Sequence, residues 1–224
     1  RVTVTGGDSV DATGMTTGLT LIADTLGNND TLTGGQGDDI FSFSSVLGLQ
    51  DGDVINGTTG TDTVRIDNSS SRFTGELDLD DVTNIDTVTV ADADGDSVNR
   101  ANLIDLTISA IASTTAASIT IDASAITDSN DAVTITNSAA TTKTEFNILG
   151  GAGADVLAGS NDNDTISGGS GADTISGGNK ADTFTGGAGA DVFMVASGES
   201  VFGTEDTITD FTTLTDDINI TVQM

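Results

Sequence analysis

The sequence lacks several residue types on which common protein chemistries depend. Its 224 residues include no Cys, His, Pro, Trp or Tyr, and only 6 Lys and Arg. Without Cys the fold cannot depend on disulfides, and without His or Cys the chain can form neither a His-based catalytic triad nor a zinc-protease motif. Because aromatic residues make up only 4% of the chain, we expect a thin, regular core of Val, Ile, Leu, Ala and a few Phe. No apolar run reaches the length of a transmembrane helix.

The charge of the chain is strongly acidic. Its 35 Asp and Glu against 6 Lys and Arg give a net charge of −29, which excludes nucleic acid as a partner because phosphates would be repelled. Disordered acidic chains are usually rich in Pro and Glu, whereas this chain has no Pro and is rich in Thr, Val and Ile. Nearly all of the acid is Asp, whose short side chain suits both turns and calcium ligation.

Five consecutive nonapeptides occupy residues 150–194. They read GGAGADVLA, GSNDNDTIS, GGSGADTIS, GGNKADTFT and GGAGADVFM. Each copy has an Asp at position six and a large apolar residue at position eight. The position-six residues are Asp155, Asp164, Asp173, Asp182 and Asp191. A period this strict indicates an architecture of stacked repeats.

The residue types of the repeat predict a parallel β-roll. Glycines permit a tight turn, and the three residues after the Asp form a short strand whose middle residue points inward. Two nonapeptides then make one coil, and successive coils stack about 4.8 Å apart. We therefore expect Asp155, Asp173 and Asp191 on one edge of the roll, and Asp164 and Asp182 on the other.

The stacked carboxylates predict Ca²⁺ as the bound metal. Carboxylates at this spacing repel each other by ~1 kcal/mol in water, and by more at a lower dielectric constant. A calcium ion between two coils removes that repulsion, because its bonds to oxygen are about half the coil spacing, while Mg²⁺ fits poorly because it requires shorter bonds. We expect glycine carbonyls to complete the ligand shell. The glycines concerned are Gly151, Gly153, Gly169, Gly171, Gly187 and Gly189.

Weaker copies of the repeat precede residue 66. Residues 25–42 keep the frame with Asp30 and Asp39, which we expect to bind calcium. Residues 48–65 also keep it, but a plain solenoid turn without metal accounts for them equally well.

The segment 67–149 has no strict period. It contains short alternating runs, each typical of a strand with two distinct faces, and residues 100–113 are expected to be mostly strand. Rungs of an irregular solenoid and a β-sandwich both remain open for this segment. The predicted strands are 86–90, 104–108, 118–122, 132–136 and 145–149.

The nonapeptide array resembles the repeats-in-toxin (RTX) family of calcium-dependent β-rolls. This resemblance implies type I secretion and calcium-triggered folding outside the cell. It also identifies residues 205–220 as the segment that closes such rolls, with Asp206, Asp210 and Asp217 expected near the last calcium sites. Lys180 departs from the family pattern, since it places a cation at the fourth position of its copy, where the pattern has Gly.

These patterns define an expected organisation and function. We predict an all-β chain with three parts: a β region with degenerate repeats (1–66), an irregular β-rich middle (67–149) and a calcium β-roll with its closing segment (150–224). The middle joined to the repeats resembles RTX-bearing surface-layer proteins, so we expect a non-enzymatic, extracellular or cell-surface protein that assembles with itself, with cell-surface polysaccharide as a possible partner. The alternatives are an adhesin segment and the non-catalytic export region of a secreted enzyme. Because the chain begins at Arg1 without a recognisable signal peptide, we expect a fragment or processed product.

Overall fold

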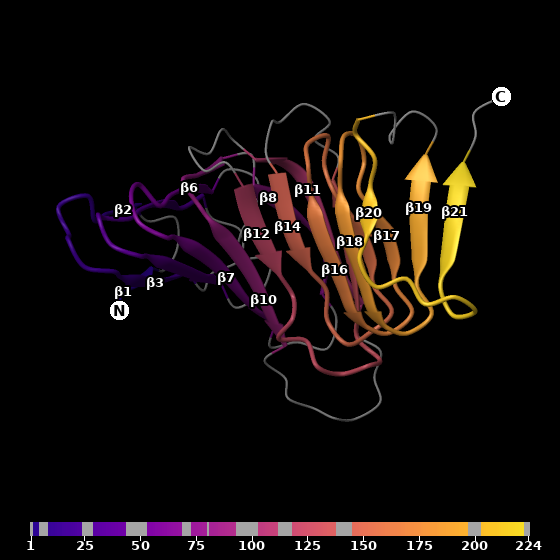
Figure 1. Ribbon diagram of the computed structural model, residues 1–224. Coiled ribbons are helices and arrows are strands. Elements are labelled where there is room, and N and C mark those ends of the chain that lie inside the picture. Colours follow the sequence, from indigo (N-terminus) through magenta and orange to yellow (C-terminus); the bar gives the residue numbers. More distant parts are fainter. Residues whose placement is uncertain are drawn as a thin grey trace.

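The chain folds as an all-β solenoid whose coils stack along one direction from the N-terminus to the C-terminus (Figure 1). The computed structural model describes residues 2–4, 9–23, 29–43, 53–68, 73–79, 81–92, 103–111, 118–137, 145–196 and 203–221. These ranges contain strands and turns but no helix, and therefore none that could cross a membrane. The predicted fold class is confirmed.

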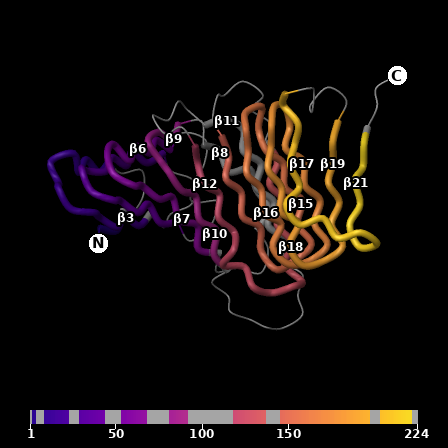
Figure 2. The backbone as a smooth tube through the Cα atoms, in the orientation of Figure 1, coloured from indigo at the N-terminus to yellow at the C-terminus, as the bar shows by residue number. Residues whose placement is uncertain are grey.

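One face of the solenoid is a single ten-stranded sheet that runs through all three segments of the chain. Its strands pair in parallel, as in β14–β16 and β16–β18, and each strand comes from a different coil (Figure 2). In spatial order the strands are β1 (Val2–Val4), β3 (Thr20–Ala23), β5 (Ile40–Phe43), β7 (Thr63–Asn68), β10 (Thr87–Asp92), β12 (Ser118–Asp122), β14 (Glu145–Leu149), β16 (Thr165–Ser170), β18 (Thr183–Ala188) and β20 (Thr207–Ile208).

The remaining strands form two further parallel sheets, which follow one another along the chain. The four-stranded sheet contains β2 (Ser9–Asp11), β4 (Thr31–Thr33), β6 (Val54–Asn56) and β9 (Val82–Thr83). The seven-stranded sheet contains β8 (Phe73–Leu79), β11 (Leu103–Ile111), β13 (Ala132–Asn137), β15 (Val156–Ala158), β17 (Thr174–Ser176), β19 (Val192–Ala196) and β21 (Asp217–Thr221). The coil between β7 and β10 contributes both β8 and β9, so the change from one sheet to the other occurs there.

The middle of the chain continues the solenoid. All five strands predicted between residues 86 and 149 are present as β10 to β14. They pair in parallel with strands of the flanking segments, for example β14 with β16 and β13 with β15. A sandwich would need antiparallel sheets, so the solenoid alternative is the one that the structure has. The strand β8 was not predicted, and the division into 1–66, 67–149 and 150–224 stays a prediction.

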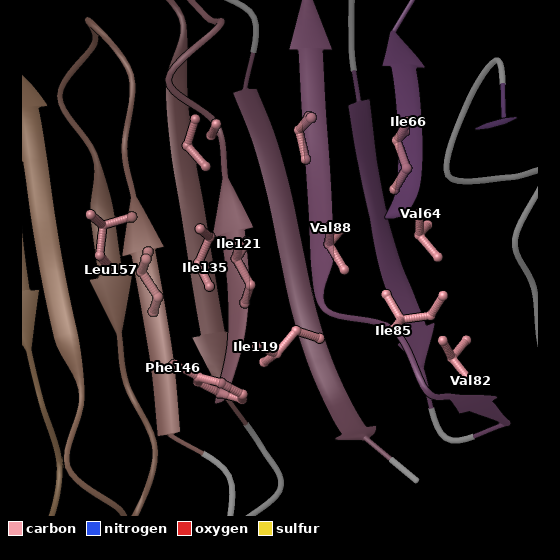
Figure 3. Close-up of a cluster of buried hydrophobic side chains, with 14 of the residues drawn as sticks. Val64, Ile66, Val82, Ile85, Val88, Ile119, Ile121, Ile135, Phe146 and Leu157 are labelled. Atoms are coloured by element: carbon pink, nitrogen blue, oxygen red, sulfur yellow. The ribbon is translucent and has the colours of Figure 1, made fainter. Parts of the chain in front are cut away.

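The core is a narrow column of side chains between the sheets (Figure 3). Position eight of each C-terminal nonapeptide supplies one buried residue, and Ile119, Ile135 and Phe146 continue the column through the middle. Two rings from successive repeats, Phe184 and Phe193, stack with their centroids 6.2 Å apart. The position-eight residues are Leu157, Ile166, Ile175, Phe184 and Phe193. This agrees with the thin, regular core that the composition predicts.

Candidate calcium-binding turns

On one edge of the roll, each coil places an Asp carboxylate against the main chain of the coil before it. Asp173 Oδ1 accepts a hydrogen bond from the Asp155 N–H at 2.8 Å, and Asp191 Oδ1 accepts one from the Asp173 N–H at 3.0 Å. The row starts where Asp155 Oδ1 accepts from the Val133 N–H at 2.7 Å. It ends where Asp216 Oδ1 accepts from the Asp191 N–H at 3.2 Å. We call Asp155, Asp173, Asp191 and Asp216 the first ladder.

The opposite edge carries a second row with the same geometry. Asp182 Oδ1 accepts a hydrogen bond from the Asp164 N–H at 2.8 Å, and Asp206 Oδ1 accepts one from the Asp182 N–H at 3.1 Å. The row begins where Asp164 Oδ1 accepts from the Phe146 N–H at 2.6 Å. We call Asp164, Asp182 and Asp206 the second ladder. The structure thus brings the five predicted position-six Asp residues into two rows, with the predicted alternation between edges.

The N-terminal copies build similar rows with longer coils. Asp62 Oδ1 accepts from the Asp39 N–H, and Asp86 Oδ2 accepts from the Asp62 N–H, both at 2.8 Å. In the four-stranded sheet, Asp53 Oδ1 accepts from the Asp30 N–H at 2.8 Å. Here the linked residues are 23 or 24 positions apart, against 18 between successive C-terminal nonapeptide coils. The longer coils keep the same contact between a carboxylate and the main-chain N–H of the coil before it.

The five position-six carboxylates of the ladders are buried, although charged groups normally stay in water, while Asp206 and Asp216 at the ends of the ladders are half-buried. Asp173 is 0% exposed, and burial raises its pKa to about 7; the neighbouring charges of Asp155 and Asp191 add to this effect, and the hydrogen bond from the Asp155 N–H opposes it. Burial likewise raises the pKa of Asp62 to about 6. Burial also raises the pKa of Asp155, Asp164, Asp191 and Asp206. A cation at the ladders would offset this cost of burying like charges.

Two carboxylate oxygens of the first ladder lack any hydrogen-bond donor. Asp173 Oδ2 and Asp191 Oδ2 are both fully buried. Each lies against the first glycine of its own repeat, so closely that a Cβ on Gly168 or Gly186 would collide with it. A buried, unpaired oxygen of a charged group is costly, and a cation would satisfy both. The carboxylate oxygens of the first ladder are therefore suited to act as ligands of a metal ion.

The predicted glycine carbonyls lie in two stacks along the first ladder. A Cβ on Gly169 would collide with the carbonyl oxygen of Gly151, and a Cβ on Gly187 would collide with that of Gly169. Gly169 and Gly187 also have φ of 106° and 98°, a backbone conformation that favours glycine. The stacks are Gly151, Gly169 and Gly187, and Gly153, Gly171 and Gly189. Glycine thus allows the turns of successive coils to approach each other's carbonyl groups closely.

The chemistry of these turns favours calcium over other metals. Within the described ranges, no three acidic side chains gather at one point, so an ion would have at most two carboxylate ligands and would need main-chain oxygens. Calcium accepts six to eight oxygens in a flexible arrangement that includes backbone carbonyls. Zinc prefers Cys and His, which this chain lacks.

The closing segment places Asp206 and Asp210 at the last turns, whereas Asp217 is not a ladder residue. Asp206 lies in the second ladder, and the Asp210 carboxylate accepts hydrogen bonds from the Gly186 and Gly187 N–H groups at 2.9 and 2.8 Å. Asp217 aligns with Val192 and is exposed. The ladder position belongs to its neighbour Asp216.

Sequence reasoning missed Asp86 and Asp216 as ladder residues. Asp86 precedes Thr87 and Val88 in the same Asp-Thr-apolar pattern that the repeats show at Asp173 and Asp182. That pattern could have found Asp86 without a regular period. Asp216 stands directly before Asp217 in the segment expected to close the roll, and the second Asp of this pair was the predicted residue.

The comparison with family models agrees with this geometry. The RTX calcium-binding nonapeptide repeat (4 copies) matches residues 24–45, 147–175 and 167–201. These ranges contain Asp30 and Asp39 and the position-six Asp residues of the C-terminal array, while residues 48–65 lie outside them. No curated protein and no solved structure matches the chain. The matched segments are similar to RTX calcium-binding nonapeptide repeats, and the metal that such repeats bind is Ca²⁺.

Proposed function

We propose that this chain is part of a secreted, non-enzymatic structural protein that binds calcium along both ladders and assembles into a bacterial surface layer or extracellular filament. The observation that carries the proposal is the pair of buried carboxylate ladders, in which Asp173 and Asp191 keep oxygens without donors. Such rows are unfavourable without a cation. Calcium at the ladders would therefore fold the roll and fix the spacing of its coils at the same time.

The proposal of secretion is supported by the cost of burying the ladder carboxylates without a cation. Extracellular calcium sites bind with dissociation constants of about 0.1–1 mM, so the ladders would stay empty at low intracellular calcium. The chain would then be unfolded during export, in keeping with type I secretion, and would fold outside the cell. The absence of Cys is compatible with a fold that takes its stability from calcium.

Self-assembly is supported by the exposed edge of the last described coil. The strand β21 ends the order of the seven-stranded sheet, and its side chains Ile218 and Ile220 are 48% and 65% exposed. An exposed apolar edge strand is a template for pairing with another strand. We propose a second copy as the occupant, with β2 at the end of its four-stranded sheet continuing the parallel stack from β21. The net charge of −29 opposes such contact until calcium neutralises part of it.

The test compares calcium with monovalent salt at matched ionic strength. We expect particles or ordered arrays in millimolar calcium, seen by light scattering and electron microscopy, and monomers in sodium chloride, because screening weakens repulsion but creates no contact. Ile220→Lys should abolish assembly while leaving calcium binding intact. If the full-length protein stays monomeric in calcium at high concentration, the structural proposal is overturned and the adhesin or export-region alternative takes its place.

A further inference from the structure

One pair of turns differs from the others in the array. Residues 159–163 and 177–181 precede Asp164 and Asp182 of the second ladder and lie in successive coils. The fourth position of the repeat is Gly171 or Gly189 in the first ladder but Lys180 here. Lys180 has a φ of 73°, which non-glycine residues seldom adopt. The backbone therefore keeps the turn shape of the repeat and places a long cationic side chain on it.

Side chains join these two turns across the coils. The Lys180 ammonium forms an ion pair with Asp162 Oδ1, which lies at the same repeat position 18 residues earlier. On one side of this pair, the Asn179 amide donates to Asn161 Oδ1, and on the other, the Ala181 N–H donates to an Asn163 side-chain oxygen at 3.3 Å. The glycine-rich turns of the first ladder carry neither Asn nor a charged side chain at these positions.

Of the two carboxylates beside this turn pair, that of Asp164 is already satisfied by the protein. Asp164 Oδ1 accepts hydrogen bonds from the Phe146 N–H at 2.6 Å and from the Ser160 hydroxyl at 3.1 Å, and Asp164 Oδ2 accepts one from the Ser160 N–H. Ser160 stands at the second repeat position, where the first-ladder copies have Gly. Asp155, which starts the first ladder, is satisfied in the same way by the Val133 and Gly151 N–H groups. The Oδ2 atoms of Asp173 and Asp191 in the first ladder, and of Asp182 beside the second turn of this pair, are buried without a hydrogen-bond donor.

We propose that the turn pair 159–163/177–181 holds no calcium and is a metal-independent clasp, in which the Lys180 ammonium takes the place of the cation between two coils. The inference rests on the calcium-binding ladders of the proposed function. It places calcium at the first ladder and none between the two turns of the second ladder that Lys180 joins. The clasp joins its two coils in the absence of calcium. The contact between these two coils therefore does not depend on the calcium concentration.

The test counts bound calcium by equilibrium dialysis of the full chain and of three variants. Lys180→Gly restores the repeat pattern and frees Asp162, so it should bind one more calcium ion per chain than the unsubstituted protein. Lys180→Met also frees Asp162, but it keeps a long side chain where the repeat pattern has Gly, so its calcium count should stay below that of Lys180→Gly. Asp173→Asn reports on the first ladder and should lower the count.

The outcomes separate the clasp from the proposed function. If Lys180→Gly binds no more calcium than the unsubstituted chain, while Asp173→Asn binds less, the clasp is overturned and the ladder model stands. If Asp173→Asn leaves the count unchanged, the ladder model itself fails. Hydrogen exchange adds a readout that does not depend on metal: in chelator, Lys180→Met should lose amide protection at Thr183–Thr185 relative to the unsubstituted chain. Equal protection in the two proteins would also overturn the clasp.

Discussion

The C-terminal coils and the middle coils use the same register with opposite chemistry. At the edge of the ten-stranded sheet, the position that holds Asp164 and Asp182 in the C-terminal coils holds Phe146 and Ile119 in the two coils before them. Both apolar residues are buried (Figure 3). One backbone geometry thus accepts either a carboxylate that needs a cation or an apolar side chain that needs only burial. The apolar column runs through both regions, and the C-terminal coils add buried carboxylates whose burial a cation would offset.

Removing calcium should have the largest effect, because it should destabilise the C-terminal coils and leave the middle coils folded. At ten times the dissociation constant, each independent site contributes ~1.4 kcal/mol, so several sites approach the ~5–15 kcal/mol stability of a whole domain. We expect chelator to remove amide protection from the first ladder, at Thr174–Ser176 and Val192–Ala196, and to leave it at Ser118–Asp122. Hydrogen exchange with mass spectrometry measures this, and circular dichroism should show a matching loss of β structure. Equal protection of both regions with and without calcium would contradict the division.

Truncating a buried side chain in the apolar core of the middle should have the next largest effect. This effect should be the same with and without calcium. Phe146 is 2% exposed, and truncating a buried Phe to Ala costs about 3–5 kcal/mol. We expect Phe146→Ala to lower the free energy of unfolding of the middle coils by a similar amount in calcium and in chelator. Urea unfolding followed by hydrogen exchange at Glu145–Leu149 measures it. A loss seen only in calcium would mean that the middle also depends on metal.

A single ladder substitution should have a smaller effect that calcium does control. Asp173 lies mid-ladder and has ladder neighbours on both sides, so Asp173→Ala should disturb two shared sites, worth about 1.4–2.8 kcal/mol at ten times the dissociation constant. The matched control is Asp128→Ala, because Asp128 accepts a local hydrogen bond from the Asn130 N–H at 2.9 Å and belongs to neither ladder. Calcium titration by calorimetry should show weaker or fewer sites only for Asp173→Ala. Similar losses in the two variants would count against the ladders.

The smallest effect should come from protons, since a proton neutralises one carboxylate whereas a calcium ion can join two. The pKa of Asp173 is raised from 3.8 to about 7 in the folded chain, so the folded state binds protons more tightly than the unfolded state. Without calcium, stability should therefore be highest at low pH and be lost as pH rises from about 4 through about 7. With calcium the trend reverses, because protons compete for the same oxygens.

Circular dichroism of calcium-depleted protein between about pH 8 and pH 5.5 tests this prediction. This pH range lies above the pI of 4.1. Asp173→Asn resembles the protonated side chain, and it should reduce the dependence on pH while lowering calcium affinity. Calcium-depleted protein that gains stability as pH rises through this window would contradict the predicted sign.

Much of the site could be read from the sequence because the repeat fixes both spacing and chemistry. Five copies with Asp at position six and an apolar residue at position eight determine which side chains face inward, and the structure places all of them as predicted. The longer N-terminal coils were harder to interpret, because a 23-residue spacing hides the alignment of Asp39 with Asp62. Asp86 was missed for the same reason, since it lies outside any complete nonapeptide.

By itself, the sequence determined the strand-and-turn alternation, the inward column of position-eight residues and the choice of calcium. These follow from local rules, namely glycine turns, two-residue periodicity and carboxylate chemistry. Only the tertiary structure decided that the middle shares the register of the roll, that Asp216 and not Asp217 completes the first ladder, and that Lys180 reaches Asp162 in the coil before it. Each of these depends on which residues of successive coils lie side by side. Where coil lengths vary, that alignment is set by packing across the whole stack, and no local pattern encodes it.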